Sequence, residues 1–434
     1  MKAVILSVGD ELVLGQTVDS NSAYLAAKLA ESGIGSLYHH TLPDDQPMIA
    51  AAIRQASSQA QCVLITGGLG PTKDDLTRQA LADAMGVEVK EDPKSIEHIQ
   101  AFFAGRGIVM SDANRVQALL PTGAEMIENA RGTAPGIRAK LNGANIFVMP
   151  GVPHEMRAMV ETTILPALKK HAGTSKTILT TKVNTFGIGE SAVGQMLESL
   201  MTRDRNPTVG TTVANGIVSI RVRSIYEDLA EARSQLEDTV AKVVNVMGPI
   251  TFGRDDQTLA DALVVALKEN SLTVATAESC TGGLIGKMIT DVSGSSQVYA
   301  GGWVTYTNEM KHSQLGVPNE LFNSNGAVSG PVVCAMAEGA LERSGADLAV
   351  SVSGVAGPTG GTEDKPVGTV WLGLAYKFGN DQETKSSAVQ IRLPGDRPSI
   401  RRRASMCALQ WLRLHVAGHP PTEMTWVMDS YPKA

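Results

Sequence analysis

The stretch Thr276–Gly283, TAESCTGG, organises the last α/β domain expected from this chain. It follows the apolar run Leu272–Ala275, which predicts a short buried strand. It leads into Leu284–Thr290, where apolar residues recur at helical spacing. Ser279 is therefore expected at a sharp strand-to-helix turn, with Thr281–Gly283 in the first turn of the helix. Such a turn presents a hydroxyl above the sheet and leaves backbone N–H groups free beside it.

The serine in this turn has two interpretations. Ser279 is either the N-cap of the following helix, a common role for serine, or a nucleophile. In the second case the backbone amides of Thr281, Gly282 and Gly283 would bind the oxyanion that develops during attack. The choice between them depends on residues further along the chain.

The composition is that of a globular protein with more than one domain. The chain has 434 residues, 43% hydrophobic and 19% charged, which is too long for a single core. A net charge of −6 gives no sign of the positively charged surface that binds nucleic acid. The four scattered cysteines form no CxxC pair, so neither disulfides nor a thiolate zinc site are expected. No apolar run is long enough for a membrane span, and no signal peptide is complete, so a cytoplasmic protein is expected.

Residues 1–172 predict a first α/β domain. Strands at Ala3–Val8 and Cys62–Thr66 alternate with helices at Asn21–Glu31 and Met48–Gln59, which indicates a parallel sheet. The second strand runs into a glycine-rich loop, and ligands of such sheets bind beyond the carboxyl ends of the strands. The loop matches neither a P-loop nor GxGxxG.

This loop supplies candidate ligands for a phosphate and a metal ion. Glycines permit close approach of the backbone to a phosphate, and carboxylates hold hard divalent cations. The phosphate candidates are Gly67, Gly68, Gly70 and Thr72, and the metal candidates are Asp74 and Asp75. The alternative is a plain strand-to-helix turn with acidic residues at the start of a helix.

Four motifs of this domain resemble the amino-terminal domain of the CinA family. They are GDELVLGQTVDSN at 9–21, TGGLGPTKDDLT at 66–77, NARGTAPGI at 129–137 and PGVPHEM at 150–156. The resemblance implies a molybdopterin-binding-like fold and a metal-dependent hydrolysis of ADP-ribose to AMP and ribose 5-phosphate. It adds the polar candidates Asp10, Asn21 and Asp45, and Glu155 as a candidate ligand or base. His154 is expected to be a loop residue, because no second histidine stands at ligand spacing.

Residues 173–254 predict a small α+β domain with the order βαββα. The expected elements are strands at Lys176–Val183, Thr208–Val213 and Ile217–Ser224 and helices at Glu190–Leu200 and Tyr226–Asn245. In the CinA family this position holds a domain compared with KH folds. The loop at 186–190 is acidic and lacks the KH spacing, so a spacer or dimerisation domain is expected rather than RNA binding.

Residues 255–434 supply candidate partners for Ser279. A strand is expected to end at Tyr306, and a helix capped by Asn308 and closed by Gly316 places Lys311 in its first turn. The helix dipole and burial both disfavour a charged lysine there, which suits a general base. Lys311 as a solvated surface residue is the alternative, and Cys280 with His312 is a rival nucleophile–base pair.

Six motifs of this last domain resemble the carboxy-terminal domain of the CinA family, which also occurs alone as nicotinamide mononucleotide deamidase. They are TAESCTGG at 276–283, GGWVTYTNEMK at 301–311, GAVS at 326–329, SVSGVAGPTGG at 351–361, PVGTV at 366–370 and PGDR at 394–397. The resemblance implies hydrolysis of nicotinamide mononucleotide to nicotinate mononucleotide and ammonia by a Ser/Lys mechanism that needs no metal. It gives the roles of nucleophile, base and assisting hydroxyl to Ser279, Lys311 and Tyr306.

Other residues of this domain are expected to bind the substrate. Gly354 and Gly357 permit close approach of a loop to the nucleotide, and Arg397 is a candidate for its phosphate. Arg401–Arg403 are expected on the outer face of the final helix. The whole chain thus predicts two α/β domains joined by a small α+β domain, with two small-molecule substrates and a homodimeric assembly. The alternatives are a molybdopterin-binding module and a competence-linked interaction protein.

Overall fold

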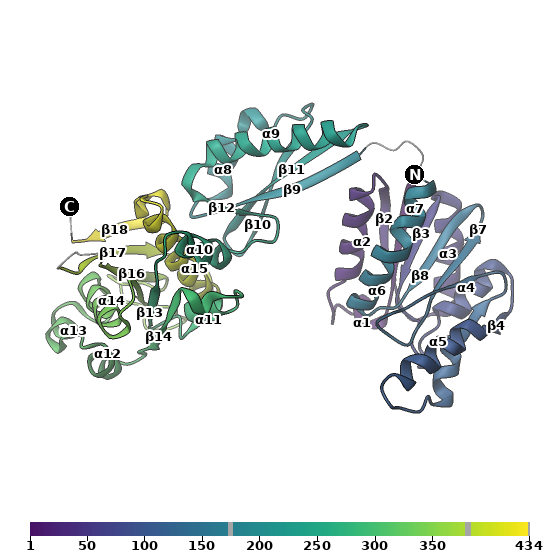
Figure 1. Ribbon diagram of the computed structural model, residues 1–434, viewed down its shortest axis with the longest axis horizontal. Helices are drawn as coiled ribbons and strands as arrows, with labels where there is room; N and C mark the ends of the chain where they lie inside the picture. Colours follow the sequence, from purple (N-terminus) through teal and green to yellow (C-terminus); the bar gives the residue numbers. More distant parts are fainter. Residues whose placement is uncertain (172–176, 378–382, 433–434) are drawn as a thin grey trace. The chain divides into compact units, whose positions relative to one another are not determined.

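The computed structural model describes residues 1–171, 177–377 and 383–432, and the chain forms two compact units (Figure 1). Unit 1 comprises Met1–Leu179 and Ile225–Arg233, and unit 2 comprises Thr180–Ser224 and Ser234–Ala434. Most of the expected middle domain therefore belongs to the same compact unit as the last domain. Within the described ranges, no helix is both long and apolar enough to cross a membrane.

Unit 1 is built on a six-stranded sheet with the order β2-β1-β3-β8-β7-β6. The strands are β1 Lys2–Val8, β2 Gly35–Leu42, β3 Cys62–Thr66, β6 Glu125–Ile127, β7 Gly136–Leu141 and β8 Ala144–Met149. The first four strands of that order are parallel, and β7 and β6 are antiparallel. The main helices are α2 Ser20–Glu31, α3 Gln46–Gln59, α4 Thr77–Met85, α5 Pro93–Ala104, α6 Pro153–Met159 and α7 Leu165–His171.

The sheet of unit 1 is covered by helices on both faces (Figure 1). Val4 and Leu6 of β1 pack in the apolar layer that includes α3 and α4, whereas Ala3 and Ile5 pack in the layer that includes α2 and α6. Successive side chains of a strand point to opposite faces. A central strand between two helical layers must therefore be apolar throughout, which explains the uninterrupted run seen in the sequence.

The middle part of the chain forms a four-stranded sheet with the order β10-β11-β9-β12. Its elements are β9 Thr177–Phe186, α8 Glu190–Met196, β10 Thr208–Ala214, β11 Ile217–Tyr226, α9 Leu229–Met247 and β12 Thr251–Arg254. The expected order βαββα is present, and β12 is an additional strand. Lys176, where the first strand was expected to begin, lies outside the described residues. Asn215 and Gly216 both have positive φ, as the expected hairpin turn requires.

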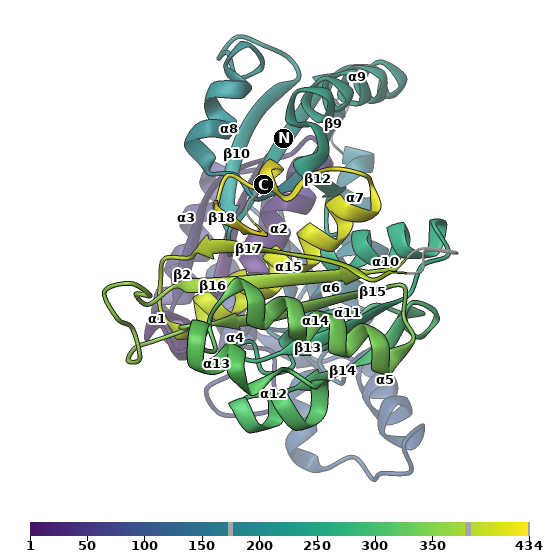
Figure 2. The ribbon, with the colours of Figure 1, turned by 90° about the vertical axis from the view of Figure 1, so that its left-hand side faces the viewer.

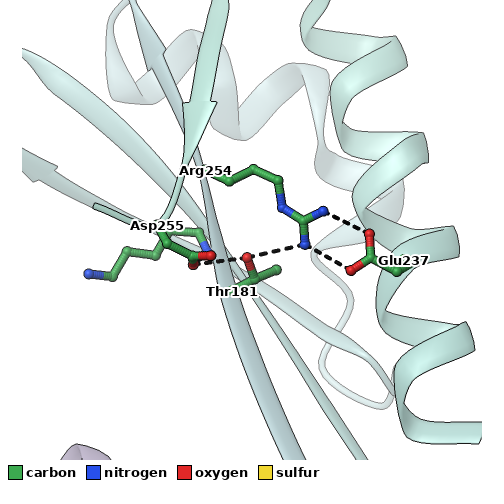
Figure 3. A network of polar contacts seen from close by, with 5 residues as sticks. Thr181, Glu237, Arg254 and Asp255 are labelled. Carbon is green, nitrogen blue, oxygen red and sulfur yellow. Dashed lines mark hydrogen bonds and ion pairs between the residues drawn. The ribbon is translucent and has the colours of Figure 1, made fainter. Parts of the chain in front are cut away.

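A polar network joins the end of β12 to α9 and β9 (Figure 3). The Arg254 guanidinium donates to both carboxylate oxygens of Glu237, at 2.8 and 2.9 Å. The carboxylate of Asp255 accepts from the Thr181 hydroxyl and the Lys182 amide, both at 2.9 Å. These contacts fix the point at which the chain leaves the middle sheet for the last domain.

The last domain is built on a six-stranded sheet with the order β14-β13-β15-β16-β17-β18. Its strands are β13 Val274–Glu278, β14 Tyr299–Val304, β15 Leu348–Gly354, β16 Thr369–Tyr376, β17 Lys385–Arg392 and β18 Val427–Tyr431. β14, β13 and β15 are parallel, and the other three strands are antiparallel. The α/β class expected for both large domains is thus confirmed, with antiparallel strands completing each sheet.

Two groups of helices cover this sheet (Figure 2). One group packs in the main apolar core and consists of α10 Leu259–Glu269, α11 Leu284–Thr290 and α15 Arg397–Val416. The other group lies on the opposite face and consists of α12 Asn308–Leu315, α13 Asn319–Asn325 and α14 Gly330–Ser344. α12 packs directly against α14, and a Cβ atom at Gly339 of α14 would collide with the backbone carbonyl oxygen of Leu315. Gly339 therefore sets how closely α12 approaches.

This close approach predicts that Gly339→Ala destabilises unit 2. We expect a fall in melting temperature of several degrees, because overpacking of a tight contact costs about 1–3 kcal/mol. Gly194→Ala in α8 is the matched control, since nothing lies within 4 Å of its added Cβ and alanine is the better helix former. Calorimetry of the full chain measures both variants. Equal melting temperatures would show that α12 and α14 are not in close contact.

Candidate active site

The turn that follows β13 carries the candidate nucleophile. The amide of Ser279 donates to the carbonyl of Val352 at 3.0 Å, which fixes it to β15, and the amide of Gly282 donates to the carbonyl of Ser279 at 3.1 Å. Gly282 and Gly283 have φ of +60° and +89°, a region that favours glycine. The helix begins only at Leu284. The expectation that residues 281–283 form the first helical turn is therefore wrong, because the left-handed conformations of Gly282 and Gly283 cannot be part of a right-handed helix.

Glu278, and not Ser279, satisfies the free amides at the start of α11. Its buried carboxylate accepts from the amides of Ile285 and Gly286, at 3.1 and 2.8 Å. The N-cap residue of α11 is Gly283, without a capping side chain. The hydroxyl of Ser279 is thereby left for another partner.

That partner is Lys311. Its amine lies 3.0 Å from the Ser279 hydroxyl oxygen and donates to the backbone carbonyl of Thr305, also at 3.0 Å. Lys311 is only 1% exposed and Ser279 8%. The helix that carries Lys311 is capped by Thr307, one residue earlier than expected, and closed by Gly316 as expected. Lys311 is thus a buried residue and not a solvated one.

The environment of Lys311 favours its neutral form. Both of its hydrogen-bond partners are uncharged, and burial lowers the pKa of Lys311 to about 8 from its ordinary value of 10.5. A substantial fraction of the amine is therefore unprotonated near pH 8, and an unprotonated amine next to a hydroxyl is the arrangement that general-base activation needs.

The rival pair does not share this arrangement. Burial raises the pKa of the Cys280 thiol to about 12, so it is protonated at neutral pH. His312 is exposed, and its Nδ1 atom lies 2.8 Å from the carbonyl oxygen of Val317. A buried protonated thiol and an exposed imidazole engaged elsewhere make a poor nucleophile and base.

Arg401 of α15 holds the carbonyls of the turn. Its Nε atom donates to the carbonyl of Cys280 at 3.0 Å, and its Nη2 atom donates to the carbonyl of Thr281 at 2.7 Å. A trans peptide directs its N–H opposite to its C=O, so Arg401 also fixes the direction of the Thr281 amide. Since the Gly282 amide is used within the turn, Thr281 and Gly283 are the remaining amide candidates for an oxyanion. The expected outward position of Arg401 is wrong.

Tyr306 lies near the site but not on the Ser–Lys pair. Its side chain is 58% exposed, and its hydroxyl accepts from Arg397 at 2.7 Å. The same guanidinium donates to the carbonyl of Gly357 at 2.7 Å. Tyr306, Arg397 and Gly357 are therefore brought together as a group beside the nucleophile turn. Gly354 has a packing role, because a Cβ atom there would lie only 2.7 Å from a methyl carbon of Val370.

Two buried hydroxyls lie next to the catalytic candidates: that of Thr281, which was predicted from the sequence only for its backbone amide, and that of Thr305, which was not found from the sequence. The side chains of Thr281 and Thr305 are fully buried, and within the described part of the chain neither hydroxyl has a hydrogen-bond partner. A buried polar group without a partner costs free energy. Such groups commonly mark a place where a ligand or water binds. No sequence pattern distinguishes these threonines from ordinary core threonines.

In unit 1 the glycine loop after β3 is a tightly packed turn. Gly67 and Gly68 have φ of +105° and +68°, and added Cβ atoms would collide with the Val8 carbonyl and the Thr77 hydroxyl. The buried Arg78 donates to the carbonyls of Leu69 and Gly70. The contacts of the loop with its own neighbours are therefore enough to explain why glycines stand here, and a bound ligand is not needed to explain them.

The two expected metal ligands do not fit that role. One oxygen of Asp75 accepts from the Gly70 amide at 2.7 Å, and the other accepts from the amide and hydroxyl of Thr72. Asp74 is fully exposed. Over the described ranges, no three His, Cys, Asp or Glu side chains form a group able to hold a metal ion. Asp75 instead shapes the loop.

Other acidic candidates of unit 1 also have local roles. Asp45 is the N-cap of α3 and accepts from the Met48 amide at 2.8 Å. Asp10 and Asp44 accept from each other's backbone amides. Partial burial raises the pKa of Asp44, and nearby acidic residues, Asp10 among them, raise it further. Asp44 was not found from the sequence, where it reads as an ordinary loop residue.

Asn21 is the candidate of unit 1 that keeps an unused polar atom. Its amide nitrogen donates to the Thr66 hydroxyl at 3.0 Å and to the Gly151 carbonyl at 2.7 Å. Its oxygen is buried and has no partner among the residues that the structure describes. Glu155 accepts from Asn129 at 2.6 Å, and His154 is exposed in the first turn of α6 rather than in a loop.

Comparison with known proteins identifies the family. The chain is 41% identical over 424 residues to the putative competence-damage inducible protein of Symbiobacterium thermophilum, covering 96% of this chain and 100% of that protein. The chain belongs to the CinA family. A CinA-like protein of Geobacter metallireducens is 39% identical over 419 residues, with coverages of 96% and 100%.

Three family models match successive parts of this CinA family chain. They are the probable molybdopterin binding domain at residues 4–170, the damage-inducible protein CinA KH domain at 180–253 and the CinA C-terminal domain at 256–416. The expected molybdopterin-binding-like, KH-like and CinA domains are therefore confirmed as folds. The prediction from the acidic loop at 186–190, a spacer or dimerisation domain rather than RNA binding, concerns the role of this domain and stays a prediction.

Solved structures resemble single domains of this chain. A CinA protein from Thermoplasma acidophilum is 30% identical and covers 39% of this chain and 98% of its own, with a TM-score of 0.36. A competence/damage inducible protein from Agrobacterium tumefaciens is 41% identical and covers 37% and 93%, with a TM-score of 0.34.

The buried amine predicts a pH-dependent stability. With a native pKa near 8 and an ordinary value of 10.5, Lys311 binds fewer protons in the native state between these pH values, so its contribution to stability rises from about pH 8 to 10.5. Lys311→Met removes the cost of the buried charge. We expect the variant to gain most in melting temperature, relative to wild type, below pH 8.

The control for this measurement is Lys268→Met, an exposed lysine of α10. Its difference from wild type should stay constant over the same pH range. Melting temperatures of the three proteins between pH 6 and 10 give the result. A difference between Lys311→Met and wild type that does not change with pH would show that Lys311 has an ordinary pKa.

Proposed function

We propose that the last domain is an amide hydrolase that converts nicotinamide mononucleotide to nicotinate mononucleotide and ammonia. The observation that carries the proposal is the 3.0 Å contact between the Lys311 amine and the Ser279 hydroxyl, inside the protein and without a carboxylate partner among the described residues. A nucleophile with an adjacent neutral base is the arrangement of Ser/Lys hydrolases. The match to the CinA C-terminal domain adds the family context.

The proposed chemistry uses these two side chains in turn. Lys311 takes the proton of Ser279 as the hydroxyl oxygen attacks the carboxamide carbon, and the oxyanion is bound by amides of the Thr281–Gly283 turn. The C–N bond then breaks, and Lys311 returns the proton to the departing ammonia. Water, activated by the same amine, cleaves the resulting ester and releases the carboxylate and the free serine.

Two features support a cationic substrate that carries a phosphate. The nicotinamide ring of the substrate bears a positive charge, and a neutral lysine does not repel it as an ammonium would. As far as the structure describes the chain, Arg397 donates only to uncharged oxygens, those of Tyr306 and Gly357. Its positive charge therefore remains available for a phosphate. In this proposal Tyr306 positions Arg397 and does not act on Lys311.

The amidase proposal predicts a specific pattern of activity loss. Ser279→Ala and Lys311→Met should each lower kcat for ammonia release from nicotinamide mononucleotide by about 10³-fold or more, as removal of a nucleophile or base does. Cys280→Ala should keep most of the activity, since its thiol is protonated. For wild type, kcat/KM should rise with pH through about 8, where Lys311 loses its proton. An inactive Cys280→Ala with an active Ser279→Ala would reverse the assignment.

We also propose that unit 1 binds ADP-ribose and hydrolyses its diphosphate. The specific observation in favour is the buried oxygen of Asn21, which has no partner among the described residues and lies at the carboxyl end of the sheet beside Thr66. Molybdopterin is the alternative ligand, because the family model of residues 4–170 is a probable molybdopterin binding domain.

This second proposal predicts that ADP-ribose binding depends on the glycine loop. Gly68→Ala should weaken binding at least tenfold, because the added methyl group collides with Thr77 and shifts the loop. Gly35→Ala is the control, since nothing lies within 4 Å of its Cβ. Calorimetric titration measures binding, and AMP release with added Mg²⁺ measures hydrolysis. Binding of molybdopterin without binding of ADP-ribose would favour the alternative.

A further inference from the structure

Unit 2 contains a cleft that the candidate catalytic side chains do not line. It has a volume of about 910 Å³ and lies between the β10–β11 hairpin and helices α10, α11 and α15. Neither Ser279, Lys311 nor Tyr306 lines it. Its apolar wall consists of Ile217, Leu259, Leu284, Met288, Met406 and Leu409. A cleft of this size and lining is typical of sites for small organic ligands.

The cleft is positively charged although the whole chain is negative. The cleft is lined by four cationic side chains and two carboxylates, which gives it a net charge of +2, whereas the whole chain has a net charge of −6. The cationic side chains are those of Lys287, Arg401, Arg402 and Arg403. The two carboxylates already have partners. Asp261 accepts from Thr258, and Asp291 is paired with Lys287.

The arginines of the cleft keep their charge uncompensated. Within residues 1–171, 177–377 and 383–432, Arg401 and Arg403 donate only to backbone carbonyls. Arg402 is exposed, and no hydrogen bond or ion pair joins it to another residue of the described ranges. Cationic side chains beside an apolar wall are complementary to a ligand with a phosphate group and a flat apolar ring.

Arg401 connects the cleft to the nucleophile turn. It lines the cleft and also holds the carbonyls of Cys280 and Thr281. An anion in the cleft competes with these two neutral acceptors for the same guanidinium. A charged acceptor makes the stronger hydrogen bond, so an anion bound in the cleft would draw Arg401 away and release the turn beside Ser279.

We propose that this cleft is a regulatory site for a nucleoside diphosphate, whose binding lowers the rate of the amidase through Arg401. The phosphates contact the arginines of α15, and the base packs on the methionines and leucines of the apolar wall. The bounded volume of the cleft and the −6 charge of the chain favour a nucleotide over a nucleic acid strand. The regulatory part rests on the proposed amidase function, whereas binding is measured without it.

The binding experiment uses the full chain and ADP as the probe. Titration calorimetry of the Gly68→Ala chain, in which the proposed unit 1 site is weakened, should show one ADP site, with weaker binding of pyrophosphate, which lacks the ring, and of adenosine, which lacks the phosphates. Arg402→Gln should weaken ADP binding about tenfold. Arg392→Gln, an exposed arginine of β17 outside the cleft, is the matched control, and both substitutions are made in the Gly68→Ala chain.

Several outcomes would overturn the site. They are the absence of ADP binding, equal binding by Arg402→Gln and Arg392→Gln, and tighter binding of a twelve-nucleotide single-stranded RNA than of ADP. Equal affinity for pyrophosphate and ADP would show that the apolar wall contributes nothing to binding, and would exclude a site for a nucleotide.

The activity experiment tests regulation. Saturating ADP should lower kcat for nicotinamide mononucleotide at least threefold, and Arg402→Gln should need about ten times more ADP for the same effect. ADP binding with an unchanged kcat overturns the regulatory role. If ammonia release is absent altogether, the amidase proposal fails while the binding data still decide whether the cleft is a nucleotide site.

Discussion

A buried amine that contacts a hydroxyl, with no counter-charge bound to it in the described part of the chain, is the constraint on which the last domain depends. Moving a lysine out of water disfavours its charge, and both partners of Lys311, the Ser279 hydroxyl and the Thr305 carbonyl, are neutral. The surrounding packing must stabilise this arrangement. α12 carries Lys311 and is held against α14 at Gly339, so the position of the amine is set by a contact between two helices away from the site.

The turn at Ser279 is held from two sides by side chains of opposite charge. Glu278 binds the amides at the start of α11, and Arg401 binds the carbonyls of the turn. The carboxylate contacts the N–H ends of peptide dipoles, and the guanidinium contacts C=O ends, so each interaction is favourable. The backbone between them is therefore fixed before any substrate arrives, and preorganised dipoles are the main source of electrostatic catalysis.

Local pattern was enough to predict the elements but not the long-range partners. The apolar run, the glycines and the helical spacing around Ser279 predicted a strand, a turn and a helix, and the structure has all three. The spacing could not show that Gly282 and Gly283 precede the helix, because that depends on the sign of φ. The sequence was limited in the same way at Asp75. It was predicted to be a metal ligand, whereas its oxygens accept hydrogen bonds from the neighbouring loop amides. A carboxylate that shapes a loop and one that binds a cation have the same local sequence.

The orientation of the final helix shows why the role of Arg401 could not be predicted from the sequence. Arg397 and Arg401 are four residues apart on α15, so they lie on one face of the helix, yet Arg397 reaches Tyr306 and Gly357 while Arg401 reaches Cys280 and Thr281. Three segments far apart in the chain thus meet at the first turns of one helix. Arginines in a basic run normally face solvent, and the position of α15 against the sheet places Arg401 of this run against the turn, where it is half-buried, whereas Arg397 stays exposed. The turn that carries Ser279 and the loop that carries Gly357 are consequently positioned by the same element, and a displacement of α15 alters both at once.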